Sequence, residues 1–197
     1  MRVAVVGMGY VGIPAAALFA DVPGFQVTGI QRRSKRSGWK IDALNRGENP
    51  IGGDEPGLEE LIQRVHKKGT FKVTDDISSV KDADAILIDV QTPTELDHQP
   101  RYESLISVSE KVGEFMRPGT LVCIESTVAP GTTQNLVLPI LEKASGMKCG
   151  QDFSLAFAYE RVMVGRLLYN ITDLPRIVGG VDPDSTNRAV ALYENIV

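Results

Sequence analysis

The 197-residue sequence predicts an α/β fold built on a doubly wound, mainly parallel sheet. Short apolar runs alternate with helical patterns along the whole chain, as strands and helices do in such folds. The run at residues 83–90 is almost continuously apolar, which is typical of a parallel strand buried on both faces. A cluster of glycines also separates the first apolar run from the first helical stretch, as at a ligand-binding strand-to-helix turn.

Gly7, Gly9 and Gly12 form a G-x-G-x-x-G motif between an apolar run at residues 3–6 and an alanine-rich stretch at 13–20. In this motif the first glycine makes a tight turn, the second lets the backbone approach a pyrophosphate, and the third lets the helix pack closely on the strand. The N–H groups at the helix start then bind the anion. The motif predicts a Rossmann-type dinucleotide site, and a glycine turn in an ordinary βα unit is the alternative.

The composition is that of an ordinary globular protein. Lys and Arg number 21 against 25 Asp and Glu, and 43% of residues are hydrophobic. The chain carries no excess of positive charge, so a nucleic-acid partner is not expected. The apolar stretches are short and no signal peptide precedes the first strand, so neither a membrane partner nor secretion is expected, and the predicted location is cytoplasmic.

The two cysteines are predicted to be reduced thiols. Cys123 lies in an apolar run and Cys149 in a loop beside a glycine, and neither has a histidine or metal-ligand partner at a recognisable spacing. No metal site and no catalytic thiol are therefore expected in this chain.

The first half of the chain predicts four strands. After a turn at 21–24, residues 26–30 form the second strand. Residues 37–68 are helical with an interruption at 47–53, and Pro56 occupies a first-turn position where the second helical pattern begins. Residues 71–74 form a short third strand and 83–90 the fourth.

The second half continues the alternation. A helix is expected at residues 102–116, a strand at 120–124, a helix start at 130–133, a strand at 153–158 and a short final strand at 176–178. A strong helix start then follows, because Asp182 provides a capping side chain and Pro183 the first helical position.

The last helix carries an apolar stripe that runs to the end of the sequence, made up of Ala189, Leu192, Tyr193, Ile196 and Val197. Residues 1–181 are therefore predicted to be a dinucleotide-binding domain. Residues 182–197 are predicted to begin a further helical region, with the remainder of the protein absent from this chain.

The position that selects the cofactor is Gln31, which comes 31 − 12 = 19 residues after the last motif glycine. Asp or Glu usually stands there and binds the ribose 2′-OH. A glutamine can still bind a ribose, but it does not repel a 2′-phosphate, which Arg32 and Arg33 could bind. The residues thus leave NAD and NADP both open, and a solvated basic loop is the alternative.

Polar residues follow three successive strands at the carboxyl edge of the predicted sheet, where open α/β sheets bind ligands. Thr92 and Pro93 follow the fourth strand, and Thr92 is a candidate cofactor contact. Thr127 follows the fifth, where its hydroxyl could orient a water or a substrate oxygen or could belong to a helix-entry turn. Glu160 and Arg161 follow the sixth, with a surface ion pair as their structural alternative.

Along its whole length the sequence resembles the nucleotide-sugar 6-dehydrogenases, which include UDP-glucose and UDP-N-acetylmannosamine dehydrogenases. The residues that carry the resemblance are 7–14 (GMGYVGIP), 44–48 (LNRGE), 55–61 (EPGLEEL), 92–93 (TP), 125–127 (EST), 130–133 (PGTT) and 160–162 (ERV). The stretches 160–166 and 176–180 look more like the N-acetylhexosaminuronate branch than the UDP-glucose branch.

The resemblance implies oxidation of the sugar C6 alcohol to a carboxylate with two NAD⁺ and a cysteine nucleophile, the substrate being of the UDP-N-acetylmannosamine type. It implies that Thr127 and Glu160 position and activate water for thioester hydrolysis. Arg161, Val162 and Arg166 would line the sugar-nucleotide site. The implied cofactor contacts are Gly7, Gly9, Tyr10, Val11, Gly12, Thr92 and Pro93, with Gln31, Arg32, Arg33 and Thr127 beside them.

Two features depart from the family pattern. Gln31 replaces the usual acid, which leaves NADP possible. The family's catalytic cysteine lies beyond Val197, so the chain alone is expected to be inactive. Related enzymes commonly dimerise through the helical region that would begin at Asp182, so a homodimer or higher homo-oligomer is expected, with Ala189, Leu192, Tyr193 and Ile196 of the terminal stripe as an exposed seam. A two-electron β-hydroxyacid-type dehydrogenase and a non-catalytic dinucleotide-binding module are the alternatives, and the sequence leaves the particular sugar open.

Overall fold

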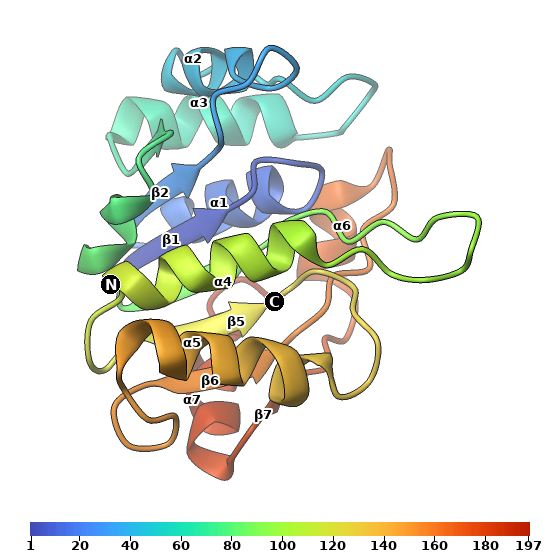
Figure 1. Cartoon of the computed structure of the whole chain (residues 1–197). Coiled ribbons are helices and arrows are strands. Elements are labelled where there is room, and N and C mark those ends of the chain that lie inside the picture. The colour runs from blue at the N-terminus through green and yellow to red at the C-terminus, as the bar shows by residue number, and fades with distance from the viewer.

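Seven strands form one sheet in the order β3-β2-β1-β4-β5-β6-β7 in the computed structural model, which describes residues 1–197 (Figure 1). Strands β1 to β6 are parallel, and β7 runs antiparallel to β6 at one edge. The predicted doubly wound parallel sheet is confirmed, with one antiparallel edge strand added. The strands are β1 (Arg2–Val6), β2 (Gln26–Ile30), β3 (Phe71–Thr74), β4 (Ala85–Ile88), β5 (Leu121–Ile124), β6 (Ser154–Phe157) and β7 (Gly179–Gly180).

Helices cover both faces of this sheet. Alternate residues of β1 point to opposite faces, so that Val3 and Val5 join the core with α1 whereas Ala4 and Val6 join the core with α4 and α5. Figure 1 shows α4 and α5 on the near face. None of the helices is long and apolar enough to cross a membrane. The helices are α1 (Gly12–Asp21), α2 (Trp39–Asn45), α3 (Leu58–Lys68), α4 (Glu103–Phe115), α5 (Leu138–Ser145), α6 (Leu167–Thr172) and α7 (Pro183–Tyr193), with a 3₁₀ helix η1 (Ile77–Asp82) and a π-helical turn η2 (Thr133–Val137).

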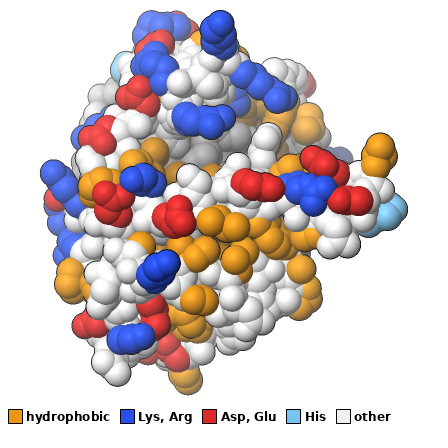
Figure 2. Space-filling view, in the orientation of Figure 1, with side chains coloured by type: hydrophobic (Ala, Val, Ile, Leu, Met, Phe, Trp, Pro, Cys, Tyr) orange, Lys and Arg blue, Asp and Glu red, His pale blue; other side chains and the backbone are white.

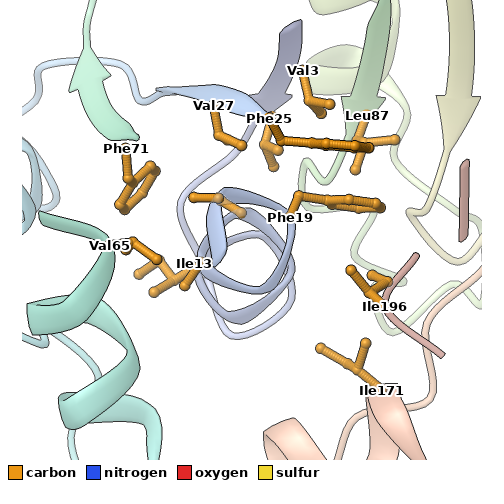
Figure 3. Packing of buried hydrophobic residues seen from close by; sticks show 14 of the residues in the cluster. Val3, Ile13, Phe19, Phe25, Val27, Val65, Phe71, Leu87, Ile171 and Ile196 are labelled. Carbon is orange, nitrogen blue, oxygen red and sulfur yellow. The ribbon is translucent and has the colours of Figure 1, made fainter. Parts of the chain in front are cut away.

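The core between α1 and the sheet is organised around Phe19. Its ring stacks on Phe25 at a centroid distance of 6.2 Å and meets Tyr193 of α7 at 6.0 Å. Figure 3 shows Ile171 and Ile196 on the α6 and α7 side of the same ring. Elements from both ends of the chain therefore share one apolar core.

The expectation that the terminal apolar stripe is an exposed seam is wrong. Asp182 caps α7 by accepting the Ser185 N–H at 2.7 Å, as predicted, but the helix lies on the sheet. Leu192 is 1% exposed and Ile196 8% exposed. The reason is β7, whose pairing with β6 turns the chain back so closely that a Cβ at Gly180 would lie 2.3 Å from the Thr186 nitrogen.

Some strand boundaries also differ from expectation. The expected strand at 176–178 is wrong, because the side chain of Arg176 is turned into the protein and only Gly179–Gly180 pairs with β6. Pairing of the fourth strand is limited to Ala85–Ile88, since the chain beyond it leaves the sheet and Val90 O accepts the Ser126 hydroxyl. The helix expected from residues 130–133 begins instead with the π-helical turn η2. Helix α6 and η1 were not expected.

The buried stripe of α7 yields a test on a single helix. Leu192→Ala should lower the free energy of unfolding by about 2–5 kcal/mol, because it opens a cavity in the core. Val190 lies on the same helix but is 37% exposed, so Val190→Ala should change the free energy of unfolding by less than about 1 kcal/mol. Denaturant unfolding measures both, and equal small effects would show that the stripe is not packed as described.

Candidate functional site

The loop between β1 and α1 has the geometry that its glycines predict. Gly7 adopts φ +114°, and a Cβ there would lie 2.4 Å from the Asp89 carbonyl oxygen. A Cβ at Gly12 would lie 2.0 Å from the Gly7 carbonyl oxygen, because α1 starts against the turn. Only glycine fits these two positions.

The same loop presents unpaired donors at the start of α1. The backbone N–H groups of Gly9, Tyr10 and Val11 make no hydrogen bond within the protein, and no acidic residue lies in the first turn of α1. A Cβ at Gly9 would meet nothing within 4 Å. The loop therefore offers free donors, the positive end of a helix dipole and open space, which together fit a pyrophosphate.

Gln31 supports this loop from the end of β2. Its amide oxygen accepts the Met8 N–H at 3.0 Å, and its amide nitrogen donates to Ser37 Oγ at 3.1 Å. Lys40 of α2 donates to the Met8 carbonyl oxygen at 3.1 Å, and burial together with the nearby Arg36 lowers the pKa of its amine. Sequence reasoning did not identify Lys40, since no local pattern connects it to a loop 32 residues earlier.

The two arginines after Gln31 differ in their surroundings. Arg33 is paired with two aspartates. Its two terminal guanidinium nitrogens lie 3.2 Å from the two carboxyl oxygens of Asp42, and its Nε lies 3.1 Å from Asp75 Oδ2. Arg32 is exposed, and no side-chain hydrogen bond or ion pair holds it. Lys and Arg side chains gather over the α2 end of the molecule in Figure 2. Of the predicted pair, only Arg32 is free to meet an anion.

The loops after β4 and β5 are joined at the carboxyl edge of the sheet. The Thr92 hydroxyl donates to the Thr127 carbonyl oxygen at 2.7 Å, and the Ser126 hydroxyl donates to Val90 O at 2.7 Å. The Thr127 side chain is exposed, and Pro93 is exposed beside Thr92. The structure thus brings the two predicted threonines together.

Glu160 is held by two donors rather than paired with its neighbour. Its Oε2 accepts from Arg176 Nη1 at 2.5 Å, and its Oε1 accepts the Arg161 N–H at 2.6 Å. Its side chain is 3% exposed. The alternative of a Glu160–Arg161 surface ion pair is therefore wrong, and the Arg161 guanidinium donates instead to Pro175 O. Burial raises the pKa of Glu160, and the charge of Arg176 opposes that rise.

Arg176 is the centre of a buried polar cluster. Its Nη2 donates to Glu125 Oε1 and, at 2.6 Å, to Ala158 O, and its guanidinium lies 4.0 Å from the centroid of the Tyr193 ring. Tyr193 donates its hydroxyl to Glu125 Oε1 at 2.8 Å. Both carboxyl oxygens of Asp89 are buried beside this cluster without a hydrogen-bond donor.

Sequence reasoning missed Asp89, Arg176 and Tyr193. The available signal was Asp89 itself, an acid inside a run read as almost continuously apolar. Tyr193 was assigned only to an apolar stripe, although a buried tyrosine hydroxyl requires a partner.

The loop after β6 is held by Glu55 from the segment before α3. Glu55 is 7% exposed and accepts the Gly165 N–H at 2.6 Å and the Leu167 N–H at 3.2 Å. This loop carries Val162, which is half-buried, and Arg166, which is exposed. The predicted substrate-lining residues thus lie on one segment anchored by a distant carboxylate.

Neither cysteine has the surroundings of a nucleophile. Burial and the nearby Glu125 raise the pKa of Cys123 to about 12. Burial also raises the pKa of Cys149. A raised pKa lowers the fraction of reactive thiolate at both cysteines at neutral pH.

Comparison with protein-family models matches residues 1–197 to the NAD binding domain of the UDP-glucose/GDP-mannose dehydrogenase family. The chain belongs to this family. The resemblance drawn from the motifs is thereby confirmed, and the open N–H groups of the glycine loop fit the pyrophosphate of the family's NAD.

Relatives match over the whole chain. It is 39% identical to a UDP-N-acetyl-D-mannosamine dehydrogenase of Pyrococcus horikoshii over 197 residues, which are 100% of this chain and 45% of that protein. It is 34% identical to a GDP-mannose 6-dehydrogenase of Pseudomonas putida, covering 100% of this chain and 44% of that protein. The crystal structure of an NDP-N-acetyl-D-galactosaminuronic acid dehydrogenase from Methanosarcina mazei superposes with a TM-score of 0.96 at 53% identity, covering 100% of this chain and 42% of that one. The chain thus spans less than half the length of these family members.

The two outer glycines and the middle one should respond differently to substitution. Gly9→Ala should leave the unfolding midpoint unchanged but weaken NAD binding tenfold or more, about 1.4 kcal/mol, because the methyl group enters the pyrophosphate space. Gly12→Ala should lower the midpoint, because its Cβ has no room. Calorimetric titration and thermal unfolding measure the two effects. Undiminished NAD binding by the Gly9 variant would remove the loop from the cofactor site.

Proposed function

We propose that the protein is an NAD-dependent nucleotide-sugar 6-dehydrogenase that oxidises the C6 alcohol of a UDP-N-acetylhexosamine to the uronic acid, and that this chain is its cofactor-binding portion. The observation that carries the proposal is that the glycine loop, Thr92, Thr127 and Glu160 all follow strand ends on the same edge of the sheet, where Thr92 is hydrogen-bonded to Thr127. Two relatives support this substrate class: the Pyrococcus horikoshii protein is named for UDP-N-acetyl-D-mannosamine, and the Methanosarcina mazei protein for an NDP-N-acetyl-D-galactosaminuronic acid.

The residues divide the work as follows. The N–H groups of Gly9, Tyr10 and Val11 bind the pyrophosphate, and the bound NAD supplies a hydride acceptor. The Thr127 hydroxyl orients the water that converts the oxidised C6 to a carboxylate, and Glu160 accepts a proton from that water. Arg161, Val162 and Arg166 line the sugar-nucleotide side of the site.

The covalent part of such a reaction needs a nucleophile outside this chain. A thiol with the burial and raised pKa of Cys123 cannot serve as one at neutral pH. We therefore propose that the 197 residues alone bind the cofactor without turnover. The proposed location is the cytoplasm, and the proposed assembly is a homodimer or higher homo-oligomer whose interface lies elsewhere than the buried stripe of α7.

The number of NADH formed per sugar distinguishes this function from its alternatives. Two NADH per UDP-N-acetylhexosamine consumed are expected from the full-length protein, because an alcohol becomes a carboxylate by loss of four electrons. Absorbance of NADH against chromatographic counting of sugar acids measures the ratio. A ratio of one would favour a two-electron dehydrogenase, and no NADH with retained NAD binding would favour a non-catalytic module.

Replacement of Glu160 tests its role in hydrolysis. Glu160→Gln in the full-length protein should slow steady-state turnover about 10²–10⁴-fold while a rapid first release of NADH remains, because only the water-dependent step needs the base. Glu114→Gln on α4, which removes an exposed carboxylate paired with Lys111, is the matched control and should turn over normally. Unchanged steady-state turnover in the Glu160 variant would exclude it as the base.

The cofactor preference is also open to test. We propose that NAD is the cofactor and that Gln31 permits NADP, with exposed Arg32 as the partner of a 2′-phosphate. Gln31→Glu keeps the acceptor for the Met8 N–H but adds a negative charge, so it should weaken NADP binding tenfold or more and leave NAD binding nearly unchanged. Calorimetric titration of both cofactors measures this. A strong preference for NAD in the unsubstituted protein would assign Arg32 to a solvated loop.

A further inference from the structure

Three carboxyl groups and one guanidinium group are buried together where β4, β5 and β6 end. Asp89 follows β4, Glu125 follows β5 and Glu160 lies beyond β6, and Arg176 reaches them from the segment before β7. The Arg176 side chain is 5% exposed, Glu125 0% and Glu160 3%. Tyr193 of α7 donates its hydroxyl to Glu125, and the buried Cys123 of β5 is close enough to feel the charge of Glu125.

The charges do not balance if every carboxyl group is ionised. Three negative charges would then face one positive charge without access to water, a costly arrangement. The donors are also unevenly distributed. Glu160 has two donors and Glu125 Oε1 has two, whereas Glu125 Oε2 and both oxygens of Asp89 have none.

One proton between Asp89 and Glu125 reduces both problems, because two negative charges instead of three then face Arg176 and one of the oxygens without a donor gains one. Ile88 lies opposite Ile124 in the paired strands, so Asp89 and Glu125 are the next residues at two neighbouring strand ends. A protonated Asp89 there can donate to the Glu125 oxygen that lacks a donor. Burial raises the pKa of Asp89 well above its usual range, and the negative charge of Glu125 adds to this rise. Asp89 and Glu125 then carry a single negative charge between them.

The consequence falls on Glu160. With one proton in the cluster, Arg176 faces two negative charges, one on each of its terminal nitrogens, instead of three. Its Nη1 hydrogen bond and the Arg161 N–H then fix both oxygens of Glu160. The guanidinium is itself fixed by the Ala158 carbonyl oxygen and by the Tyr193 ring beneath it.

We propose that Arg176 is a positioning residue that holds Glu160 ionised and oriented, and that a proton shared by Asp89 and Glu125 keeps Arg176 available for this task. The catalytic consequence rests on the proposed function of Glu160 as the base. The arrangement of charge and proton does not, and it is measurable without turnover.

Substitution of Asp89 tests the shared proton through the pH dependence of stability. The folded protein keeps Asp89 protonated, whereas the unfolded chain ionises it above its ordinary pKa of 3.8. Wild-type stability therefore falls as pH rises from that value toward the raised folded pKa. Asn cannot ionise and still donates to Glu125, so Asp89→Asn escapes this loss.

The expected result is a gain in unfolding midpoint for Asp89→Asn over wild type that grows as the pH rises above about 4. Asp89→Ala lacks the donor and should be less stable than Asp89→Asn throughout this range. A difference between Asp89→Asn and wild type that does not change with pH would show that no raised proton is held at Asp89, and would overturn that part of the proposal.

The positioning of Glu160 is tested by its carboxyl titration. In the full-length protein with ¹³C-labelled glutamate, Glu160→Gln assigns the signal. Arg176→Met should raise the Glu160 pKa by roughly one unit or more, because the opposing positive charge is lost. Arg176→Lys keeps a positive charge, so it should raise the Glu160 pKa by less than Arg176→Met does. The control is Arg188→Met, which removes an arginine bound to Ser154 at the other end of β6 and should leave the titration unchanged.

Turnover then separates the two proposals. If Glu160 is the base, the acid limb of the kcat profile should move to higher pH in Arg176→Lys by the same amount as the titration. If the Glu160 pKa shifts but the acid limb of the kcat profile does not, the role of Glu160 as the base is contradicted, whereas Arg176 remains its positioning residue. If the Glu160 pKa is unchanged in both Arg176→Met and Arg176→Lys, the inference is overturned, regardless of the activity of the variants.

Discussion

The pairing of β1 with both β2 and β4 is the interaction on which the rest of the site depends. Val6, the last residue of β1, lies opposite Ile30 on one side and Ile88 on the other. The glycine loop therefore emerges between Gln31 and Asp89, which continue those two neighbouring strands. The Gly7 N–H bonds to Ile30 O, and its Cα faces the Asp89 backbone so closely that no side chain fits. Because the chain leaves β1 toward β2 and returns at β4, the crevice for a ligand opens at this loop.

The same parallel arrangement explains why charges are buried here. The carboxyl ends of β4, β5 and β6 meet at one edge, so the acids that follow them meet as well. Arg176 compensates them because β7 is too short to keep its neighbouring residues in the sheet, which frees the arginine to turn inward. Helix α7 then covers the cluster and supplies Tyr193. The position of Glu160 therefore depends on β7, on α7 and on the polar cluster between them, because Arg176 and Tyr193 both belong to this region.

The sequence predicted what local pattern and strand order determine. β2 and β3 were predicted with their observed limits, and the glycine loop and the edge that gathers Thr92, Thr127 and Glu160 followed from strand order alone. Features that depend on long-range contacts were missed. The stripe of α7 was predicted to be exposed because periodicity shows that a face is apolar but not what covers it. Arg176 was read as a strand residue because its partners lie 16 and 51 residues away. Asp89 carried a local signal, an acid at the end of a buried run, whose meaning depends on Glu125.

The central claim is that the carboxyl edge of the sheet, at the glycine loop, holds the cofactor. The opposite edge offers the most direct comparison, since the lining of a groove of about 480 Å³ there includes Arg2, Lys72 and Lys81 together with Asp76 and Asp82. Hydrogen–deuterium exchange with and without NAD distinguishes the two places. Slowed exchange at the N–H groups of Gly9, Tyr10 and Val11, with none at residues 69–72, is the result that the structure predicts. Protection confined to residues 69–72 would contradict it.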